Sequence, residues 1–527
     1  MKKLWIGIAA AVAVLAIGGF ALTRIAEQKL HKALADIPGA QIDFKKVSLS
    51  PILGNLEFRD VEITLRDSTH AVPDVQGRIE AISLEQLRWR SLVKGEANAK
   101  RLVIRGPMAQ LVLHPVPVEP KPVLEDSTAR SAKTSFLQKV SLSELRVEKA
   151  AIGVRSEKDS LKVSAQDMAF SVRDFSVLLA ENRVEYNDSS YCFSLDSLDY
   201  TDAPGLSRVQ IGHLASIDAG PVKAHGIHAY NCVPKEQLAE KMGKVAAMWY
   251  DAKLDSVYIS PLDISRMMSE HCVDIDSVSV AGKEVVLFQD DRYLPAVPYT
   301  TIQESLNALD IPLHIRTIRV QVPSFAFIWE TTHINRGTFP MRNVQIAINS
   351  ISNAPDNRMK LRVNSGHAPG SRLNFSMNIR NDKRETTSGA IQIYNMDVSR
   401  LDGFIRPLFG ATIEADIHQI DCSFKGDKHQ MTSNFCMLYD NLKVKVWNDA
   451  TAPYQIVAKN SGAVSFLANL VLPKSNPSKA GKDPKKVEVV IERDPMPPYA
   501  SYILQNLTQG MLYTMLPGGG HVRKTQK

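Results

Sequence analysis

Histidine and cysteine side chains come closest together in the sequence at His213, His225, His228 and Cys232. Zinc accepts imidazole and thiolate ligands, so this cluster is the best metal candidate in the chain. On a straight strand, however, His225 and His228 are three positions apart and point to opposite faces, so they would converge only with a turn at Gly226. We therefore expect no metal site here.

Two acidic pairs, Asp274 with Asp276 and Asp290 with Asp291, could supply the two carboxyl groups that glycoside cleavage requires. Their closeness in sequence is explained more simply by exposed turns. The chain also lacks a nucleophile elbow, a phosphate-binding loop, a dinucleotide fingerprint, an H-E-x-x-H helix and an EF-hand loop. We expect no catalytic residue and no cofactor, and therefore a protein that is not an enzyme.

The five cysteines are Cys192, Cys232, Cys272, Cys422 and Cys436, and no two of them form a C-x-x-C pair. Their odd number and wide spacing indicate neither a disulfide framework nor a zinc knuckle. Small buried thiols are the favoured interpretation. A bridge such as Cys422 to Cys436 is the alternative in an oxidising compartment.

The composition excludes several classes of protein. Of 527 residues, 44% are hydrophobic and 23% charged, and 28 Gly with 28 Pro are too few for a collagen-like or disordered chain. The 63 basic and 56 acidic residues leave a net charge of only +7, so no nucleic-acid-binding surface is indicated. The length predicts three or four domains, or one long repetitive architecture.

An uncharged stretch, residues 4–22, opens the chain between Lys3 and Arg24. As a helix it would be about 28 Å long, close to the thickness of a bilayer core. A cleaved signal peptide is the alternative, because Ala16 and Gly18 are small residues at a suitable spacing. We expect a single-pass anchor. The residues expected to contact lipid are Leu4, Trp5, Ile6, Ile8, Val12, Val14, Leu15, Ile17, Phe20 and Leu22.

Beyond the anchor, apolar and polar residues alternate at period two, the pattern of half-buried strands. An irregular version, with a step of three between two apolar pairs, recurs five times. Its apolar positions are Leu56, Phe58, Val61 and Ile63; Ala97, Ala99, Leu102 and Ile104; Val140, Leu142, Leu145 and Val147; Val273, Ile275, Val278 and Val280; and Leu313, Ile315, Ile318 and Val320. A step of three moves the second pair to the other face of a straight strand, so one buried face requires the extra residue of a β-bulge. Because bulges bend strands, we expect a curled sheet.

Most of these segments are followed by another apolar run, for example 152–154 or 285–288. In addition, the pattern apolar-Asp-β-branched-Ser-Arg-apolar occurs at 262–267 and again at 396–401, each time before a fresh alternating segment. We infer a repeated unit made of a short helical or turn segment, a bulged strand and its antiparallel return. Stacked units of this kind make one long sheet.

The few expected helices and the linkers complete the organisation of the chain. Apolar stripes predict a helix over 235–254 and an amphipathic helix near the end, from Tyr499 to Met511, which could cap the edge of a sheet. The expected divisions are 1–34, anchor and following helix; 35–114, N-terminal β unit; 115–132, Pro-rich linker; 133–472, elongated β-sheet body with the helix near 235–254; and 473–527, lysine-rich loop, strand and C-terminal amphipathic helix.

The order and spacing of elements in two regions resemble a known family. The anchor followed by segments 47–65, 79–92 and 95–113, together with segment 388–447, is similar to the AsmA-like proteins of diderm bacteria. The resemblance covers about a third of the chain. It implies an inner-membrane anchor, a periplasmic body and a long curled β-sheet with an apolar groove, as in bridge-like lipid transfer proteins linked to phospholipid movement towards the outer membrane.

Taken together, these features predict a mainly β protein, in which an N-terminal transmembrane helix precedes a long, curled antiparallel β-sheet, groove-like or taco-like, with a few short helices. We expect it to handle lipids or to support outer-membrane assembly without catalysis, with phospholipid acyl chains as ligand and envelope proteins as further partners. The residues expected to line the groove are Leu142, Leu145, Val147, Val273, Ile275, Val278, Leu313, Ile315, Ile318 and Val320. Two alternatives stay open: an ordinary closed core, and an anchored scaffold that binds envelope proteins through its sheet edges.

Overall fold

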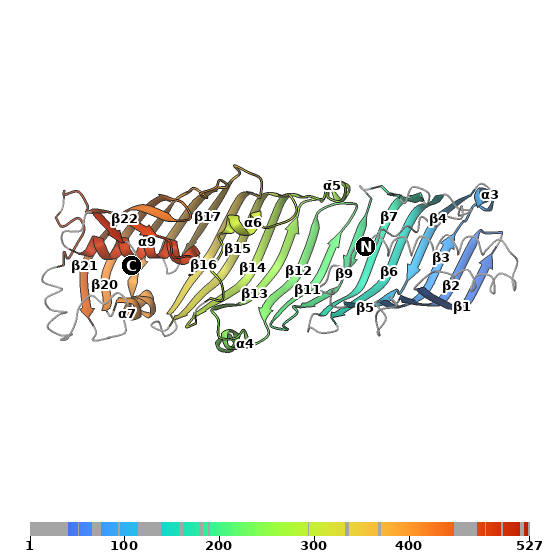
Figure 1. The fold of residues 1–527 in the computed structure, drawn as a ribbon, viewed down its shortest axis with the longest axis horizontal. Helices are drawn as coiled ribbons and strands as arrows, with labels where there is room; N and C mark the ends of the chain where they lie inside the picture. Colours follow the sequence, from blue (N-terminus) through green and yellow to red (C-terminus); the bar gives the residue numbers. More distant parts are fainter. Residues whose placement is uncertain are drawn as a thin grey trace, which may run out of the picture. The chain divides into compact units, whose positions relative to one another are not determined.

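The computed structural model describes residues 40–50, 52–65, 75–92, 95–113, 139–156, 162–178, 183–187, 190–293, 295–331, 337–366, 370–409, 411–446, 472–479, 481–496, 499–516 and 521–524. These residues are mainly β, as expected (Figure 1). The expected anchor at 1–34 and the Pro-rich linker at 115–132 lie outside the described residues. Within the described ranges, none of the helices is long and apolar enough to cross a bilayer.

The chain forms two compact units, Met1–Ile227 (unit 1) and His228–Lys527 (unit 2), which we describe separately. The strands of unit 1 are β1 (Ala40–Ser50), β2 (Asn55–Leu65), β3 (Val75–Glu85), β4 (Glu96–Arg105), β5 (Met108–Leu113), β6 (Lys139–Ser156), β7 (Lys162–Leu178), β8 (Arg183–Glu185), β9 (Cys192–Leu195), β10 (Ser197–Thr201) and β11 (Ser207–Ser216), with the short helix α3 (Trp89–Leu92). The division between the units falls within β12 (Val222–Asn231). Strands on both sides of the expected linker belong to unit 1, because β4 and β5 both pair with β6.

Unit 2 consists of strands with short helical segments between them. Its strands are β13 (Ala247–Ile259), β14 (Val273–Asp291), β15 (Leu313–Thr331), β16 (Gly337–Ser352), β17 (Arg358–Gly366), β18 (Arg372–Arg380), β19 (Thr387–Asp397), β20 (Ala411–Gly426), β21 (Gln430–Val446), β22 (Lys486–Glu492) and β23 (His521–Lys524). Its helical segments are η1 (Lys235–Gln237), α4 (Leu238–Lys241), α5 (Ile264–Ser269), α6 (Ile302–Asn307), η2 (Val398–Leu401), α7 (Asp402–Phe409) and α9 (Tyr499–Met515).

Strand pairing is mixed, which corrects the expectation of an antiparallel sheet. Most neighbours are antiparallel, but β6 runs parallel to β4 and β5, β15 to β14, and β23 to β22. A parallel neighbour requires a connection that returns the chain to the edge where the first strand began. In unit 2 the connection from β14 to β15 does this and contains α6.

Residues in the left-handed conformation can keep apolar side chains at odd spacing on one face of a strand, as β16 shows. Phe339, Ile348 and Ile351 all pack in or against one core cluster. Their separations of nine and three are odd, so a regular strand would place neighbours in this series on opposite faces. Asn343 (φ 51°) and Ser350 (φ 58°) lie between them and each restores the register.

The same conformation occurs in other strands, but it supplies the expected extra residue in only one of the five segments, β2, where Asp60 lies between Phe58 and Val61. In the other four segments the residues between the two apolar pairs have no positive φ angle. Left-handed residues within strands are Asp60 in β2, Lys149 in β6, Asp167 and Asp174 in β7, Gly226 in β12, Asn395 in β19 and Asn441 in β21. Most are Asp or Asn, whose short polar side chains tolerate this conformation better than other side chains do. Each of them bends its strand while the apolar side chains stay on one face.

The bulges also correct one part of the inferred repeat. The runs 152–154 and 285–288 are not antiparallel return strands; they continue β6 and β14 beyond a bulge. A bulge lets a strand change direction without ending, so one strand carries both apolar runs. The short helical segments before β14 and β20 are present as expected, as α5 and as η2 with α7.

The helix expected over 235–254 is present only in its first turns. Helical structure ends at Lys241, Gly243 and Lys244 take positive φ angles, and the chain continues as β13. Pairing of β13 with β14, where Trp249 lies opposite Phe288, decides the conformation of the second half. By contrast, the C-terminal amphipathic helix is confirmed as α9.

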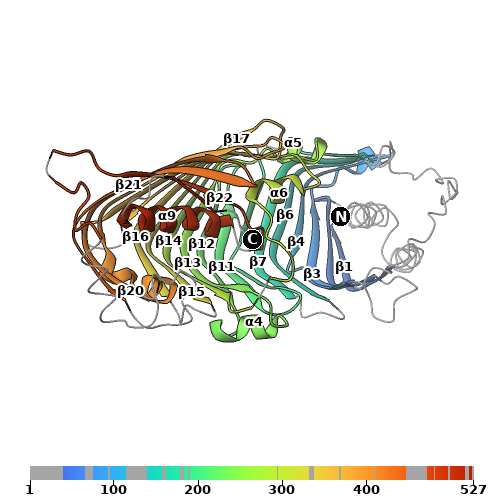
Figure 2. The same cartoon turned by 60° about the vertical axis from the view of Figure 1, so that its left-hand side comes forward.

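The core of unit 1 is organised in rows that cross the strands. Leu56, Leu84, Leu102, Leu145 and Val172 are successive cross-strand partners in β2, β3, β4, β6 and β7, and all five are buried. Such a row removes apolar surface from water at roughly 25 cal/mol per Å². In unit 2 an apolar cluster is formed by β16 to β22 with η2, α7 and α9, and α9 lies along the inside of the curved strands (Figure 2).

Candidate functional site

Unit 2 contains an apolar cavity of about 390 Å³ between the sheet, η2, α7 and α9. All of its lining residues are apolar except Thr508. From the strands and their connection the lining residues are Phe327, Trp329, Phe339, Val363, Leu373, Phe375, Ile391, Ile393, Met396, Leu401, Ile405 and Ile413. From α9 they are Ala500, Ile503, Leu504, Leu507, Thr508, Met511, Leu512 and Met515.

Helix α9 forms one wall of the cavity. It is amphipathic, but its polar side is buried against the sheet and its apolar side faces the cavity. Its apolar stripe, with Ile503, Leu507 and Met511 at spacings of four, faces the cavity. Its other side carries buried polar residues and faces β21, where the hydroxyl of Ser433 donates to Oδ1 of Asn506 at 2.8 Å. The polar contact sets the rotation of the helix, and the apolar stripe is consequently left for the cavity.

A half-buried lysine holds the C-terminal end of α9. Lys485 Nζ donates to the carbonyl oxygens of Tyr513, at 2.8 Å, and Leu516. These carbonyls lie in the last turn and have no partner within the helix, and the helix dipole favours a cation there. Burial lowers the pKa of Lys485. The loop after β21 thus contributes a specific anchor for the cavity wall.

The cavity wall holds no ionisable group, which limits what it can do. The one ring N–H of the wall, on Trp329, donates to Oδ2 of Asp291 at 2.8 Å. Burial raises the pKa of Asp291, and hydrogen bonds from Gln289 and Trp329 oppose this rise. A wall that is apolar apart from Thr508 suits an apolar ligand, since each buried methylene contributes roughly 0.8 kcal/mol.

The structure brings together the expected groove residues of β14 and β15. Val273 lies beside Leu313, Ile275 beside Ile315, and Val278 beside Ile318. All of these residues, and Val320 beyond them, are half-buried. Ile315 and Ile318 also pack against the main core cluster. They form a partly accessible apolar band, but none of them lines the 390 Å³ cavity.

The expected groove residues of unit 1 have a different environment. Leu142 and Leu145 are 3% and 5% exposed, whereas Val147 is half-buried. Leu145 belongs to the buried row that crosses β2 to β7. The burial of Leu142 and Leu145 favours the alternative of a closed core at these two positions.

Sequence reasoning missed the cavity itself, although two signals pointed to its parts. The apolar run 325–329 contains Phe327 and Trp329, and the stripe from Tyr499 to Met511 contains the helix side of the wall. Neither signal shows that strand and helix, about 170 residues apart, face each other. That meeting depends on the register of the strands between them.

Two of the four candidate metal ligands, His213 and His228, contact carboxylates instead. His213 Nδ1 lies 2.7 Å from Oδ1 of Asp196, and His228 Nε2 lies 2.8 Å from Oδ1 of Asp251. Among the described residues, no group of three or more His, Cys, Asp or Glu side chains could hold a metal ion.

The acidic pairs lie on β14 and not on exposed turns, which corrects that expectation. Asp274 contacts Arg266 and His314, and Asp276 pairs with Arg316. Both carboxylates thus serve as ion-pair partners of neighbouring basic side chains.

The second acidic pair lies at the opposite end of the same strand. Asp290 is 1% exposed and forms an ion pair with Arg292 at 2.7 Å. Arg292 also lies 3.5 Å from Glu330 on β15. The charge of each buried carboxylate is thus offset locally, as burial requires.

A bridge between Cys422 and Cys436 is excluded by the register of β20 and β21. Cys422 lies opposite Phe435, whereas Cys436 lies opposite Asp421. Side chains alternate between faces along a strand, so the two thiols lie on opposite faces of the sheet. All five cysteines are free. Burial raises the pKa of the Cys422 thiol to about 11, and a hydrogen bond with Ser433 opposes this rise.

No model of a known protein family matches this chain, and no curated protein is similar enough to be reported as a relative.

Proposed function

We propose that this protein binds lipids through the acyl chain, with the apolar cavity of unit 2 as a binding site and without catalysis. The observation that carries the proposal is the cavity wall, which is apolar apart from Thr508 and holds no ionisable group. A site of this composition gains free energy from hydrocarbon and offers little to a polar headgroup. The ligand class is therefore defined by its chain.

The half-buried band on β14 and β15 extends the same chemistry along the sheet. Its cross-strand pairs, such as Ile275 with Ile315, keep apolar surface partly accessible. The repeated bulges keep this surface on one face while the strands curve. These features support a curled, groove-like sheet that shields acyl chains, as the resemblance to AsmA-like proteins implies.

The setting of this activity follows from the amino-terminal sequence. The uncharged residues 4–22 would anchor the protein in the inner membrane, with the body in the periplasm, where lipids pass towards the outer membrane. We propose lipid handling or support of outer-membrane assembly at this place.

The test is lipid analysis of the purified full-length protein. Mass spectrometry should find phospholipid or free fatty acid bound to it. Ile503→Trp and Leu507→Trp fill the cavity with apolar atoms, so the fold should persist while the bound lipid decreases. Met248→Trp on β13 is the matched control, because Met248 is 45% exposed and does not line the cavity. Equal lipid content in the filled variants and the control would refute the cavity as the site.

A further inference from the structure

The connection from β14 to β15 crosses the concave side of unit 2. The path along β14 is 19 residues, or about 60 Å. From the end of β14 at Asp291, the chain reaches Tyr299 in eight residue steps, at most about 29 Å. Tyr299 already lies at the opposite rim, where its N–H donates to the carbonyl oxygen of Pro495 at 2.9 Å. The connection is therefore too short to follow the curved strands from one rim to the other. It must cross the open space on their concave side.

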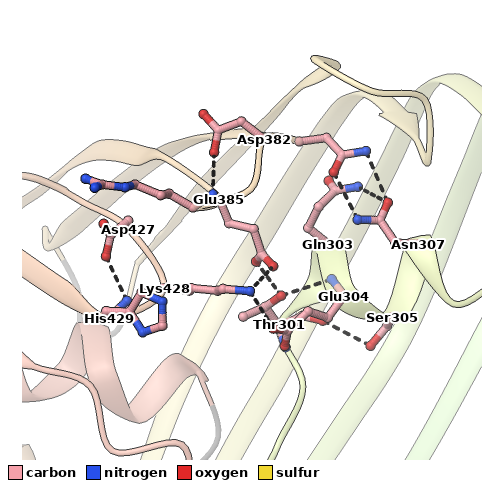
Figure 3. Close-up of polar contacts among 12 residues, drawn as sticks. Thr301, Gln303, Glu304, Ser305, Asn307, Asp382, Glu385, Asp427, Lys428 and His429 are labelled. Carbon is pink, nitrogen blue, oxygen red and sulfur yellow. Dashed lines mark hydrogen bonds and ion pairs between the residues drawn. The ribbon is translucent and has the colours of Figure 1, made fainter.

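At that rim, the segment 295–312, which we call the clasp, is fastened to three turns between strands. Thr301 Oγ1 donates to Oε2 of Glu385 in the turn between β18 and β19 (Figure 3). Lys428, in the turn between β20 and β21, lies 3.2 Å from Glu304 and 3.7 Å from Glu385. Gln303 donates to the carbonyl oxygen of Ser352 at the end of β16.

The fastening is a specific polar network in a mostly buried place. Thr301 and Glu385 are 4% and 5% exposed, and Gln303 is 1% exposed. The capping box of α6 uses Thr301 and Glu304 as well, so the same two side chains start the helix and hold it to the rim. Asn307 and Asn381 add a pair of amide contacts at 3.0 and 3.1 Å. One acceptor of the network, Gln303 Oε1, is buried without a hydrogen-bond partner. Such a group is costly, so it weakens the closed arrangement relative to an open one.

One arginine connects the clasp to the cavity wall. Arg493 Nη2 donates to the carbonyl oxygen of Tyr299 at 2.8 Å. The guanidinium carbon of the same residue lies 5.3 Å from the ring centre of Tyr499, the first residue of α9. Arg493 therefore contacts both the clasp and the first residue of the helix that lines the cavity.

We infer that the clasp is a gate for the cavity, closed by the contacts of Thr301 and Lys428 with Glu385 and Glu304. Ligand then enters and leaves when these contacts open and the clasp lifts from the rim. The inference rests on the proposed function, because it concerns access to the same cavity. Since the clasp does not line the cavity, opening should change the rates of binding more than the affinity.

The experiment compares Lys428→Met with Lys425→Met in the full-length protein. Both remove one lysine near the end of the same hairpin, but Lys425 is exposed and lies outside the network. Stopped-flow fluorescence with dansylundecanoate should show association and dissociation rates at least about tenfold higher in Lys428→Met, with a nearly unchanged Kd. If this variant does not fold, Thr301→Val should show the same effect and Thr301→Ser should restore the rates.

Hydrogen exchange at residues 299–307 measures the clasp without any ligand. We expect faster exchange there in Lys428→Met than in Lys425→Met. Equal exchange in the two variants would refute the claim that Lys428 holds the clasp to the rim, whether or not the probe binds. Faster exchange with unchanged probe rates would overturn the gate. Failure of the wild-type protein to bind the probe would instead refute the proposed function, and the gate with it.

Discussion

Gly510 of α9 lies directly against the ring of Phe435 on β21. A β-carbon at Gly510 would come within 2.4 Å of two ring carbons, much closer than van der Waals contact. Only glycine lets the helix approach β21 this closely, and this approach sets the position of the cavity wall.

Gly510→Ala should therefore destabilise unit 2, although alanine is the better helix former by about 1 kcal/mol. Overpacking of a fitted contact typically costs roughly 1–3 kcal/mol, which is enough to reverse the sign. Thermal unfolding would measure the change. Adding Phe435→Leu should restore part of the stability, and a more stable Gly510→Ala variant would contradict the close contact.

Asn343, in the middle of β16, should accept glycine but not valine. Its φ of 51° is left-handed, a conformation that costs other residues roughly 1–2 kcal/mol. Strand propensity alone would predict that Asn343→Val stabilises the protein, whereas the left-handed φ predicts that it destabilises the protein. Denaturant unfolding of Asn343→Val and Asn343→Gly would decide between them. Gln345→Val, at an exposed position of the same strand without a positive φ, is the control and should be neutral.

Lys485→Met should loosen the C-terminal turn of α9. The variant removes the cation that donates to the carbonyls of Tyr513 and Leu516, a contribution of about 1–2 kcal/mol in a partly buried site. Hydrogen exchange across α9 should accelerate most in its last turn. Lys479→Met, in the same loop but exposed, should leave exchange unchanged. Equal effects from the two variants would show that Lys485 does not anchor the helix.

The stabilising effect of Glu304 should depend on pH. Hydrogen bonds from the backbone of Thr301 and from Lys428, with the charge of Arg493 nearby, lower the pKa of Glu304, and burial opposes this. Glu385, which shares Lys428, is the other carboxylate facing it. A lowered pKa in the folded state gives stability that is present above the unfolded value of about 4.3 and is lost as the pH falls through the folded value.

The measurement for Glu304 is the difference in Tm between wild type and Glu304→Gln. The difference should be largest near pH 7 and should shrink towards pH 3, as the wild-type carboxylate becomes protonated. A difference that stays constant over this range would mean that the charge of Glu304 contributes nothing to holding α6.

Local patterns gave correct expectations wherever neighbours in sequence decide the structure. The spacing from Tyr499 to Met511 predicted α9, and the step from Phe58 to Val61 predicted the extra residue that Asp60 supplies in β2. The same step from Ile315 to Ile318 did not produce a bulge, because β15 keeps its register with β16 there. Alternation could not show whether a second apolar run returns or continues, because a bulge within one strand and a turn between two strands leave similar patterns. The prediction of a helix over 247–254 was wrong for a related reason. Pairing of this segment with β14 outweighed the helical spacing of its apolar residues.

The sequence by itself determined the mainly β class and the terminal helix, because each follows from the spacing of apolar side chains within a few residues. Only the tertiary structure decided that α9 faces Phe327 and Trp329 across a cavity, and that the clasp reaches Glu385 and Lys428. Those meetings join residues far apart in the chain. Each meeting depends on the register and the bend of every strand in between, summed across the sheet. No local pattern specifies that sum.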